Sequence, residues 1–333
     1  MNEPSGGSRA TPRARVGIVV PARNAEAFIE ETLESIFRQA FVDWTCVVVD
    51  DGSSDDTAGR VERFVREDPR VALLRSGPGG PCAARNKGAD ALAGLTDYLV
   101  FMDADDRWLP HALTTLVTAA ETTSEAIGAH GLGEFIDERG AALHPGAFSA
   151  LGRSRLGCGG GWPRKWPADH PTTFENVVTQ SVVFPPGLIL VRASTFRQVG
   201  SFDDTVRYAE DWDILIRLAR LGPFAFVDDV VLEYRRHDTN LGASREVAAA
   251  VRRVRQRAFY SPENTREQRR VVRDAWRAAQ VIDGMDRLRS ARDLVRRRRV
   301  GESLLQIARI PLLAARWLRG APPRSGTSWG RPR

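Results

Sequence analysis

The sequence predicts an α/β protein built on a mixed, mostly parallel sheet flanked by helices, with a helical C-terminal extension. Three observations support this prediction. Short apolar runs alternate with helical stretches over the first 120 residues, two of these runs end in aspartates, and arginines concentrate after residue 245. Such alternation places consecutive strands parallel to one another, with helices on both faces of the sheet.

The first half supplies four strands in order. RVGIVV, closed by Pro21, predicts a strand buried on both faces, and a helix is expected over residues 25–39. A second strand from Trp44 ends at Asp50 and Asp51, after which GSSDDT provides a turn and cap for a helix over residues 57–66. A third strand at 71–74, a Gly-Pro turn, the helix CAARNKGADALAG and a fourth strand ending in acids at 103–106 follow.

The second half is less regular. Residues 140–170, rich in Gly and Trp, favour a long functional loop. Regular structure resumes with GLILVRASTFRQVG, the helix AEDWDILIRLARLG ended by Gly222, and a strand over 224–234. The last helical segment, ESLLQIARIPLLAARWLRG, suits an interfacial helix kinked at Pro311, with three arginines on one face: Arg309, Arg316 and Arg319.

Composition limits the function classes. The 333 residues carry a formal charge of +6 and include three cysteines without metal-type spacing, so buried free thiols are expected. The first residues contain no apolar signal segment, and no run of 18 apolar residues occurs, so we expect a cytoplasmic protein without a transmembrane helix.

The acidic residues fall where a ligand would bind. In sheets of this kind ligands bind at the carboxyl ends of the strands, and Asp50, Asp51 and residues 103–106 follow such ends. Strand alternation would place Asp103 and Asp105 on one side, where two carboxylates can reach one hard divalent cation. The alternative is that these acids cap the helix beginning near Pro110, which we keep for Asp106 in particular.

Five stretches in order carry a resemblance: VVPARN, VVVDDGSSDDT, GGPCAARNKG, FMDADD and AEDWDILIRLA. Over residues 16–236 the sequence resembles the family 2 glycosyltransferases, which have the Rossmann-like GT-A fold. The resemblance implies transfer of a sugar, with inversion, from a nucleotide-diphosphate sugar to an acceptor hydroxyl in polysaccharide, glycolipid or other cell-envelope glycan synthesis. It also implies a GT-A domain over residues 15–240, made of a nucleotide-sugar half (15–120) and an acceptor half (121–240). A disordered N-terminal segment (1–14) would precede this domain, and an Arg-rich helical extension with a disordered tail (241–333) would follow it.

The resemblance assigns the donor site. Asp51 matches the acid that bonds the base, with Asp50 at the ribose, and an acceptor carboxylate favours uracil or thymine, hence a UDP- or dTDP-sugar. Arg85 matches a basic residue near the nucleotide, with Asn86 and Gly88 shaping that turn; otherwise Arg85 is a solvated helix residue. The full nucleotide-sugar set is Pro21, Ala22, Asn24, Asp50, Asp51, Arg85, Asp103 and Ala104.

A metal and a base complete the implied site. Asp103 and Asp105 match the DXD motif and, with His237, would bind Mn²⁺ or Mg²⁺, although a lone histidine is often structural. Asp211 matches the general base, with a helix-dipole partner as its alternative. Acceptor-side candidates are Glu210, Trp212, Trp162 and Trp166, with helix packing as the alternative for Trp212. Arg235 and Arg236 are assigned either to the phosphates or to the surface.

Three other classes of protein share parts of this pattern. A receiver domain would end near 120 residues, whereas this pattern continues to residue 236. A nucleotidyltransferase needs a glycine-rich, arginine-containing N-terminal loop that VVPARNAEAF lacks. A non-catalytic sugar-nucleotide binder remains as the third alternative. The expected partners are the donor and a glycan or lipid-linked acceptor, without nucleic acid. The C-terminal helices either touch the inner face of the plasma membrane or form a solvated appendage or dimer surface.

Overall fold

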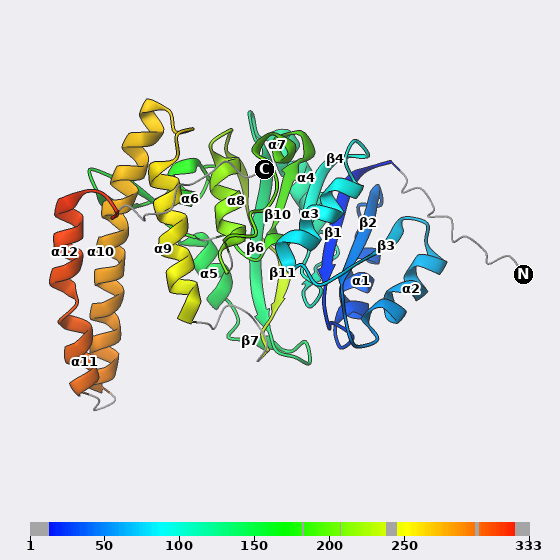
Figure 1. Cartoon of the computed structure of the whole chain (residues 1–333), viewed down its shortest axis with the longest axis horizontal. Coiled ribbons are helices and arrows are strands. Elements are labelled where there is room, and N and C mark those ends of the chain that lie inside the picture. The colour runs from blue at the N-terminus through cyan, green and yellow to red at the C-terminus, as the bar shows by residue number, and fades with distance from the viewer. Residues whose placement is uncertain (1–12, 182, 207, 238–244, 297–299, 324–333) are drawn as a thin grey trace, which may run out of the picture.

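A computed structural model describes residues 13–181, 183–206, 208–237, 245–296 and 300–323 (Figure 1). The two segments expected to be disordered at the ends lie almost wholly outside these residues. The first strand already begins at Ala14, the last residue of the expected N-terminal segment.

The described residues form a nine-stranded mixed sheet and a separate two-stranded hairpin. The order in the large sheet is β3-β2-β1-β4-β10-β6-β11-β5, with β7 paired to β6. The strand bounds are β1 Ala14–Ala22, β2 Trp44–Asp51, β3 Val71–Ser76, β4 Thr96–Phe101, β5 Arg107–Trp108, β6 Gly128–Ile136, β7 Ala142–Leu143, β8 Leu156–Gly159, β9 Trp162–Lys165, β10 Ile189–Arg192 and β11 Phe224–Arg235.

The helices fill the connections between these strands. Their bounds are α1 Ile29–Phe37, α2 Thr57–Glu67, α3 Pro81–Ala91, α4 Ala112–Thr122, α5 Ala147–Arg153, α6 Phe174–Thr179, α7 Ala193–Val199, α8 Glu210–Ala219, α9 Arg245–Tyr260, α10 Arg266–Arg296, α11 Val300–Ile307 and α12 Ile310–Arg319, with a short 3₁₀ turn at Pro186–Leu188.

The first four strands confirm the predicted parallel sheet. β1 lies between β2 and β4 and is parallel to both, with Ala22 opposite Asp50. Apolar β-branched residues fill this region because both faces are covered, and Val16, Ile18, Val19 and Val20 are completely buried. Helix α3 approaches β1 closely at Gly88, where a Cβ would lie 2.3 Å from Val19 Cγ1. Gly88 therefore serves helix–sheet packing and not, as expected, the shape of a turn.

The sheet then changes direction. β10 enters between β4 and β6 and is antiparallel to both, while β11 is parallel to β6. The fold is thus the mixed, mostly parallel sheet flanked by helices that the sequence predicts.

Two local expectations were wrong. Residues 140–170 are not one long loop, because they contain α5 and the β8–β9 hairpin. β4 ends at Phe101, and the acids that follow lie in a turn closed by a hydrogen bond from Asp106 N to Asp103 O. Strand alternation therefore cannot orient Asp103 and Asp105.

Of the C-terminal helices, α9 and α10 contribute to the hydrophobic core, whereas α11 and α12 form an outer layer. Buried apolar residues of α9 and α10, such as Val254, Val272 and Ala278, belong to the same cluster as the sheet. α12 packs against the middle of α10 and α11 against its C-terminal part, and both lie at one end of the long axis of the molecule, opposite α2 and β3 (Figure 1). Cys46, Cys82 and Cys158 are buried free thiols, as predicted. None of the helices described is both long and apolar enough to cross a bilayer.

Candidate active site

The loops after β1 and β2 are tied together at the edge where the donor site is expected. Asn24 has a φ of 51°, a left-handed conformation that asparagine tolerates well. Its side-chain oxygen accepts a hydrogen bond from Ser54 N at 2.9 Å, while its backbone N–H donates to Ser53 Oγ at 3.0 Å. Pro21 and Ala22 end β1 directly beside Val49 and Asp50 of β2.

The two aspartates that end β2 are both buried. Asp50 accepts a hydrogen bond from Ser53 N at 3.1 Å, which holds the turn after the strand. Asp51 accepts from the backbone N–H groups of Gly79 and Gly80 at 2.8 and 2.7 Å. Each carboxylate oxygen of Asp51 thus shapes the Gly-Pro turn, and only its remaining lone pairs are available to a base.

Helix α3 connects the two halves of the sheet through neighbouring residues. Arg85 is buried and donates to Asp103 Oδ1 at 2.8 Å and to Glu210 Oε1 at 3.1 Å. Asn86 donates to Phe202 O at 2.9 Å and accepts from Phe202 N at 2.8 Å. One helix therefore fixes the first acid of DADD, the start of α8 and the loop that leads to α8.

The carboxylates after β4 have different partners. Asp103 turns to Arg85, whereas Asp105 Oδ2 lies 2.8 Å from His237 Nε2. The His237 ring stacks on Phe28, with centroids 5.2 Å apart. Burial raises the pKa of Asp103, and Arg85 opposes this rise while Asp105 adds to it. The carboxylates of Asp103 and Glu210 therefore converge on the buried guanidinium of Arg85.

Asp106 is not the helix cap that we considered. Its Oδ1 accepts the backbone N–H of Arg235 at 3.0 Å, and helix α4 is preceded instead by His111. Burial raises the pKa of Asp106 well above its ordinary value, with Asp105 contributing further. Arg235 is completely buried and donates to Asp105 O, Glu138 O and Glu31 Oε2, so it braces the site instead of facing phosphates. Arg236 is exposed over the ring of Phe135.

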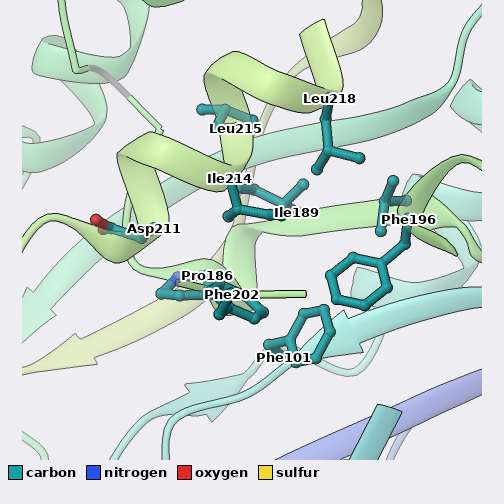
Figure 2. Close-up of a pocket in the computed structure, with 10 residues that line it drawn as sticks. Phe101, Pro186, Ile189, Phe196, Phe202, Asp211, Ile214, Leu215 and Leu218 are labelled. Carbon is teal, nitrogen blue, oxygen red and sulfur yellow. The ribbon is translucent and has the colours of Figure 1, made fainter. Parts of the chain in front are cut away.

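Asp211 lies in the first turn of α8, at the margin of an apolar cavity of about 20 Å³ (Figure 2). Rings of Phe101, Phe196 and Phe202 and aliphatic residues of α8 line this cavity, and the Asp211 carboxylate points away from them (Figure 2). Burial raises the pKa of Asp211 to about 6, and the charge of Glu210 adds to the rise. A carboxylate tuned toward neutral pH is suited to accept a proton.

The three tryptophans assigned to the acceptor side have different surroundings. Trp212 is 2% exposed and donates from Nε1 to Val177 O at 2.7 Å, so it is a core residue and cannot stack on a sugar. Trp166 is half-buried and donates to Pro171 O. Trp162 is exposed at the end of the β8–β9 hairpin and contacts Trp317 of α12, not the carboxylates. The packing alternative is thus correct for Trp212.

The predicted metal ligands offer suitable chemistry without forming a cluster. No group of three or more potential ligands within binding range occurs among the residues that the structure describes. Asp105 and His237 nevertheless place a carboxylate oxygen and an imidazole nitrogen side by side, with Asp103 in the same turn. Carboxylate oxygens suit hard divalent cations such as Mg²⁺ and Mn²⁺, and substrate phosphates commonly supply further ligands.

The structure brings together Asp103, Arg85 and the start of α8, places Asp51 against the turn that leads into α3, and excludes Trp212. Sequence reasoning missed that Arg85 connects Asp103 to Glu210, and that Glu31 holds Arg235. It also missed the aromatic support of His237 by Phe28. No local sequence pattern predicts these contacts, because the residues that form them are far apart in the chain.

The fold and this arrangement of acids define a GT-A type glycosyltransferase scaffold. Residues 17–176, just under half of the chain, match the model of the family described as "Glycosyl transferase family 2". A relative from Campylobacter jejuni, the GalNAc(5)-diNAcBac-PP-undecaprenol beta-1,3-glucosyltransferase, is 34% identical over 108 residues, which cover 32% of this chain and 34% of its own. Matches to three curated relatives span 26%, 34% and 65% of their lengths.

Solved structures show the same fold at low sequence identity. Staphylococcus aureus TarS 1-349 in complex with UDP-GlcNAc has a TM-score of 0.56 and 15% identity, covering 90% of this chain and 92% of its own. The mannosyltransferase PcManGT from Pyrobaculum calidifontis, in complex with GDP-Man and Mn²⁺, has a TM-score of 0.58 and 18% identity, covering 94% and 89%.

Proposed function

We propose that this protein is an inverting glycosyltransferase that moves a sugar from a nucleotide diphosphate to an acceptor hydroxyl, with Asp211 as the general base. The observation that carries the proposal is the contact of Arg85 with both Asp103 and Glu210. Through this contact Asp103, which is assigned to the donor, is linked by one side chain to α8, the helix that carries the base. Direct attack by one activated hydroxyl inverts the anomeric centre.

The donor would bind along the ends of β1, β2 and β4. Asn24, Asp50 and Asp51 lie at the nucleoside end of this edge, and Arg85 lies between Asp103 and Glu210. A UDP- or dTDP-sugar is favoured because carboxylate oxygens accept from the imide N–H of the base. The UDP-GlcNAc complex of TarS supports this choice, whereas the GDP-Man complex of PcManGT makes a guanine donor the natural comparison.

A divalent cation, Mn²⁺ or Mg²⁺, would be held by Asp105 and His237, with Asp103 beside them. When bound, such an ion neutralises the charge that develops on the leaving diphosphate. The residues of this chain supply the remaining functions. Asp211 takes the proton of the acceptor hydroxyl, Arg85 maintains the spacing of the acids, and Phe202 with its neighbours keeps water from one side of Asp211.

The acceptor proposed is a lipid-linked glycan of cell-envelope synthesis. The name of the Campylobacter relative includes a diphosphate-linked undecaprenol, which supports this class. Glu210, Trp162 and Trp166 are the acceptor-side candidates that remain after the exclusion of Trp212. A protein that meets such an acceptor would work at the inner face of the plasma membrane.

The decisive experiment is hydrolysis of a panel of UDP-, dTDP- and GDP-sugars with Mn²⁺, because slow donor hydrolysis requires no acceptor. We expect one donor to be hydrolysed by the natural protein and not by Asp211→Asn, with binding of the donor retained in the variant. Donor binding without hydrolysis in the natural protein, under all metal conditions, would instead favour the non-catalytic binder. Absence of both binding and hydrolysis across the panel would reject the proposed function.

A further inference from the structure

The exposed apolar side chains of this protein are concentrated at one end. Among the described residues, 12 large hydrophobic side chains are exposed, and eight of them lie on α10, α11 and α12. A ninth is Trp162, on the hairpin that touches α12. Scattered exposed leucines need no explanation, but a concentration of this kind marks an interaction surface.

Helices α11 and α12 present this apolar surface outward. Ser303 and Leu313 are buried on the inner side, where Leu313 lies opposite Gly284 of α10. On the outer side Leu304, Leu305 and Leu312 are each more than 60% exposed. Ile307 and Leu318 are also exposed, and we call the five aliphatic residues of α11 and α12 the leucine face: Leu304, Leu305, Ile307, Leu312 and Leu318. α11 and α12 form the outermost layer of the molecule (Figure 1).

Exposed arginines lie on the same segment as the leucine face. Arg309, Arg316 and Arg319 are all exposed, and the only acidic residue from 302 to 320 is Glu302. Residues 245–323 contain 20 arginines against eight acidic residues, whereas the rest of the chain has an excess of acids. An amphipathic helix with an apolar face and flanking arginines is typical of helices that lie in the headgroup region of a bilayer.

The β8–β9 hairpin adds an aromatic edge to this surface. Trp317 donates from its indole nitrogen to Gly161 O at 3.1 Å, and its ring lies 6.0 Å from that of Trp162. Arg277 of α10 lies over Trp317, with its guanidinium carbon 5.3 Å from the ring centroid. Tryptophan is enriched at the level of lipid headgroups because one part of the ring is apolar and the other donates a hydrogen bond.

We propose that the leucine face, with Arg309, Arg316, Arg319 and Trp162, docks on a bilayer of anionic lipid. The aliphatic side chains enter the boundary of the acyl chains, and the guanidinium groups bind lipid phosphates. A second copy of the chain fits this surface less well, because a two-fold contact would bring the arginines near α12 against one another, and residues 302–320 offer only Glu302 to neutralise them. The proposal stands on this surface alone and is independent of the transfer reaction.

Vesicle co-sedimentation of the full chain tests this surface. We expect binding to vesicles of phosphatidylglycerol mixed with phosphatidylcholine, and at least about tenfold weaker binding to pure phosphatidylcholine. The variant Leu312→Asp with Leu318→Asp should lose binding at least about tenfold to the anionic vesicles. The matched control Val42→Asp with Leu221→Asp changes two exposed apolar residues elsewhere and should bind as the natural protein does.

A second variant separates charge from apolar contact. Changing Arg309, Arg316 and Arg319 to Gln should weaken binding to anionic vesicles, while the same change at the exposed Arg252, Arg253 and Arg270 should weaken it much less. Unchanged thermal unfolding of each variant shows that the fold is retained. The proposal is overturned if the natural protein does not bind anionic vesicles, or if both arginine triples act equally. It is also overturned if light scattering shows a dimer that Leu312→Asp with Leu318→Asp dissociates.

Discussion

Arg85 donates a hydrogen bond to Glu210, 125 residues further along the chain, at a distance of 3.1 Å. The same guanidinium donates to Asp103. One buried cation thus lies between the carboxylates of Asp103 and Glu210, which would otherwise repel each other. The neighbouring carboxylates raise the pKa of Arg85 against the effect of its burial. The stability of the site and its geometry thus depend on the same side chain.

Replacing Arg85 should destabilise the protein strongly. In Arg85→Met two largely buried carboxylates lose their partner, and the free energy of unfolding should fall by about 3 kcal/mol. Urea denaturation at pH 7 measures this loss. Arg38→Met, which breaks an exposed ion pair with Glu34, is the control and should cost less than about 0.5 kcal/mol. Equal effects in the two variants would contradict a central role for Arg85.

Asp211→Asn should remove activity and increase stability together. Loss of the base should lower the rate of transfer or donor hydrolysis by about 10² to 10⁴. The pKa of Asp211 is raised from 3.8 to about 6, so its ionisation at pH 8 costs roughly 3 kcal/mol of folding free energy that asparagine does not incur. Stability contributed by the protonated group is present below pH 4 and is lost as pH rises toward 6. Thermal unfolding should therefore show a gain for the variant above pH 6 and little difference at pH 4.

The rate of the natural protein should depend on the same ionisation. Because the base must be deprotonated, kcat/KM for the donor should rise with pH through about 6 and reach a plateau above 7. Steady-state hydrolysis between pH 5 and 8 measures this profile. A rate that stays constant from pH 5 to 8 would show that Asp211 is not the base.

Removal of the metal should act through Asp105 and His237. Chelation by EDTA should abolish donor hydrolysis, and added Mn²⁺ should restore it. His237→Phe keeps a ring that can stack on Phe28 but removes the nitrogen ligand. This variant and the separate variant Asp105→Asn should each weaken Mn²⁺ binding at least about tenfold, measured by calorimetry with UDP present. The exposed Asp97→Asn is the control. Unaltered Mn²⁺ affinity in both site variants would remove these residues from the proposed metal site.

Gly88→Ala tests the close packing of α3 on β1. The added methyl group would overlap Val19, so the helix must shift, and the protein should lose about 1 to 3 kcal/mol of stability. Since α3 also carries Arg85, donor affinity should fall as well. Gly77→Ala, where a Cβ meets nothing within 4 Å, is the matched control for urea denaturation.

Much of the fold was predictable because its signals are local. The buried runs before Asp50 and Asp103 mark their strands without reference to the rest of the chain. Two further features of the structure also have local signals in the sequence. Gly160 and Gly161 have positive φ and form the two-residue turn of the β8–β9 hairpin, for which Gly-Gly is a known indicator. Trp212 shares the buried side of α8 with Leu215, Ile216 and Ala219, a helical spacing that predicts core packing.

The remainder of the site depends on contacts that no local pattern contains. His237 meets Asp105 across 132 residues, and Arg235 meets Glu31 across 204. The spacing of residues in the sequence does not predict which acid pairs with a buried arginine, because many acids could neutralise it. Only the order of strands, with β10 inserted between β4 and β6, decides which of them lies within reach.

The antiparallel β10 also determines when the sheet can close during synthesis. One edge of β4 is complete as soon as it pairs with β1, but its other neighbour begins only at Ile189, nearly 90 residues after Phe101. A ribosome adds that length in about 5 to 20 s, and throughout this time an apolar strand displays unpaired backbone groups. The nascent chain therefore passes through a stage in which the sheet is incomplete and one edge of β4 is unpaired. A truncated chain that ends before Arg192 should aggregate and not fold.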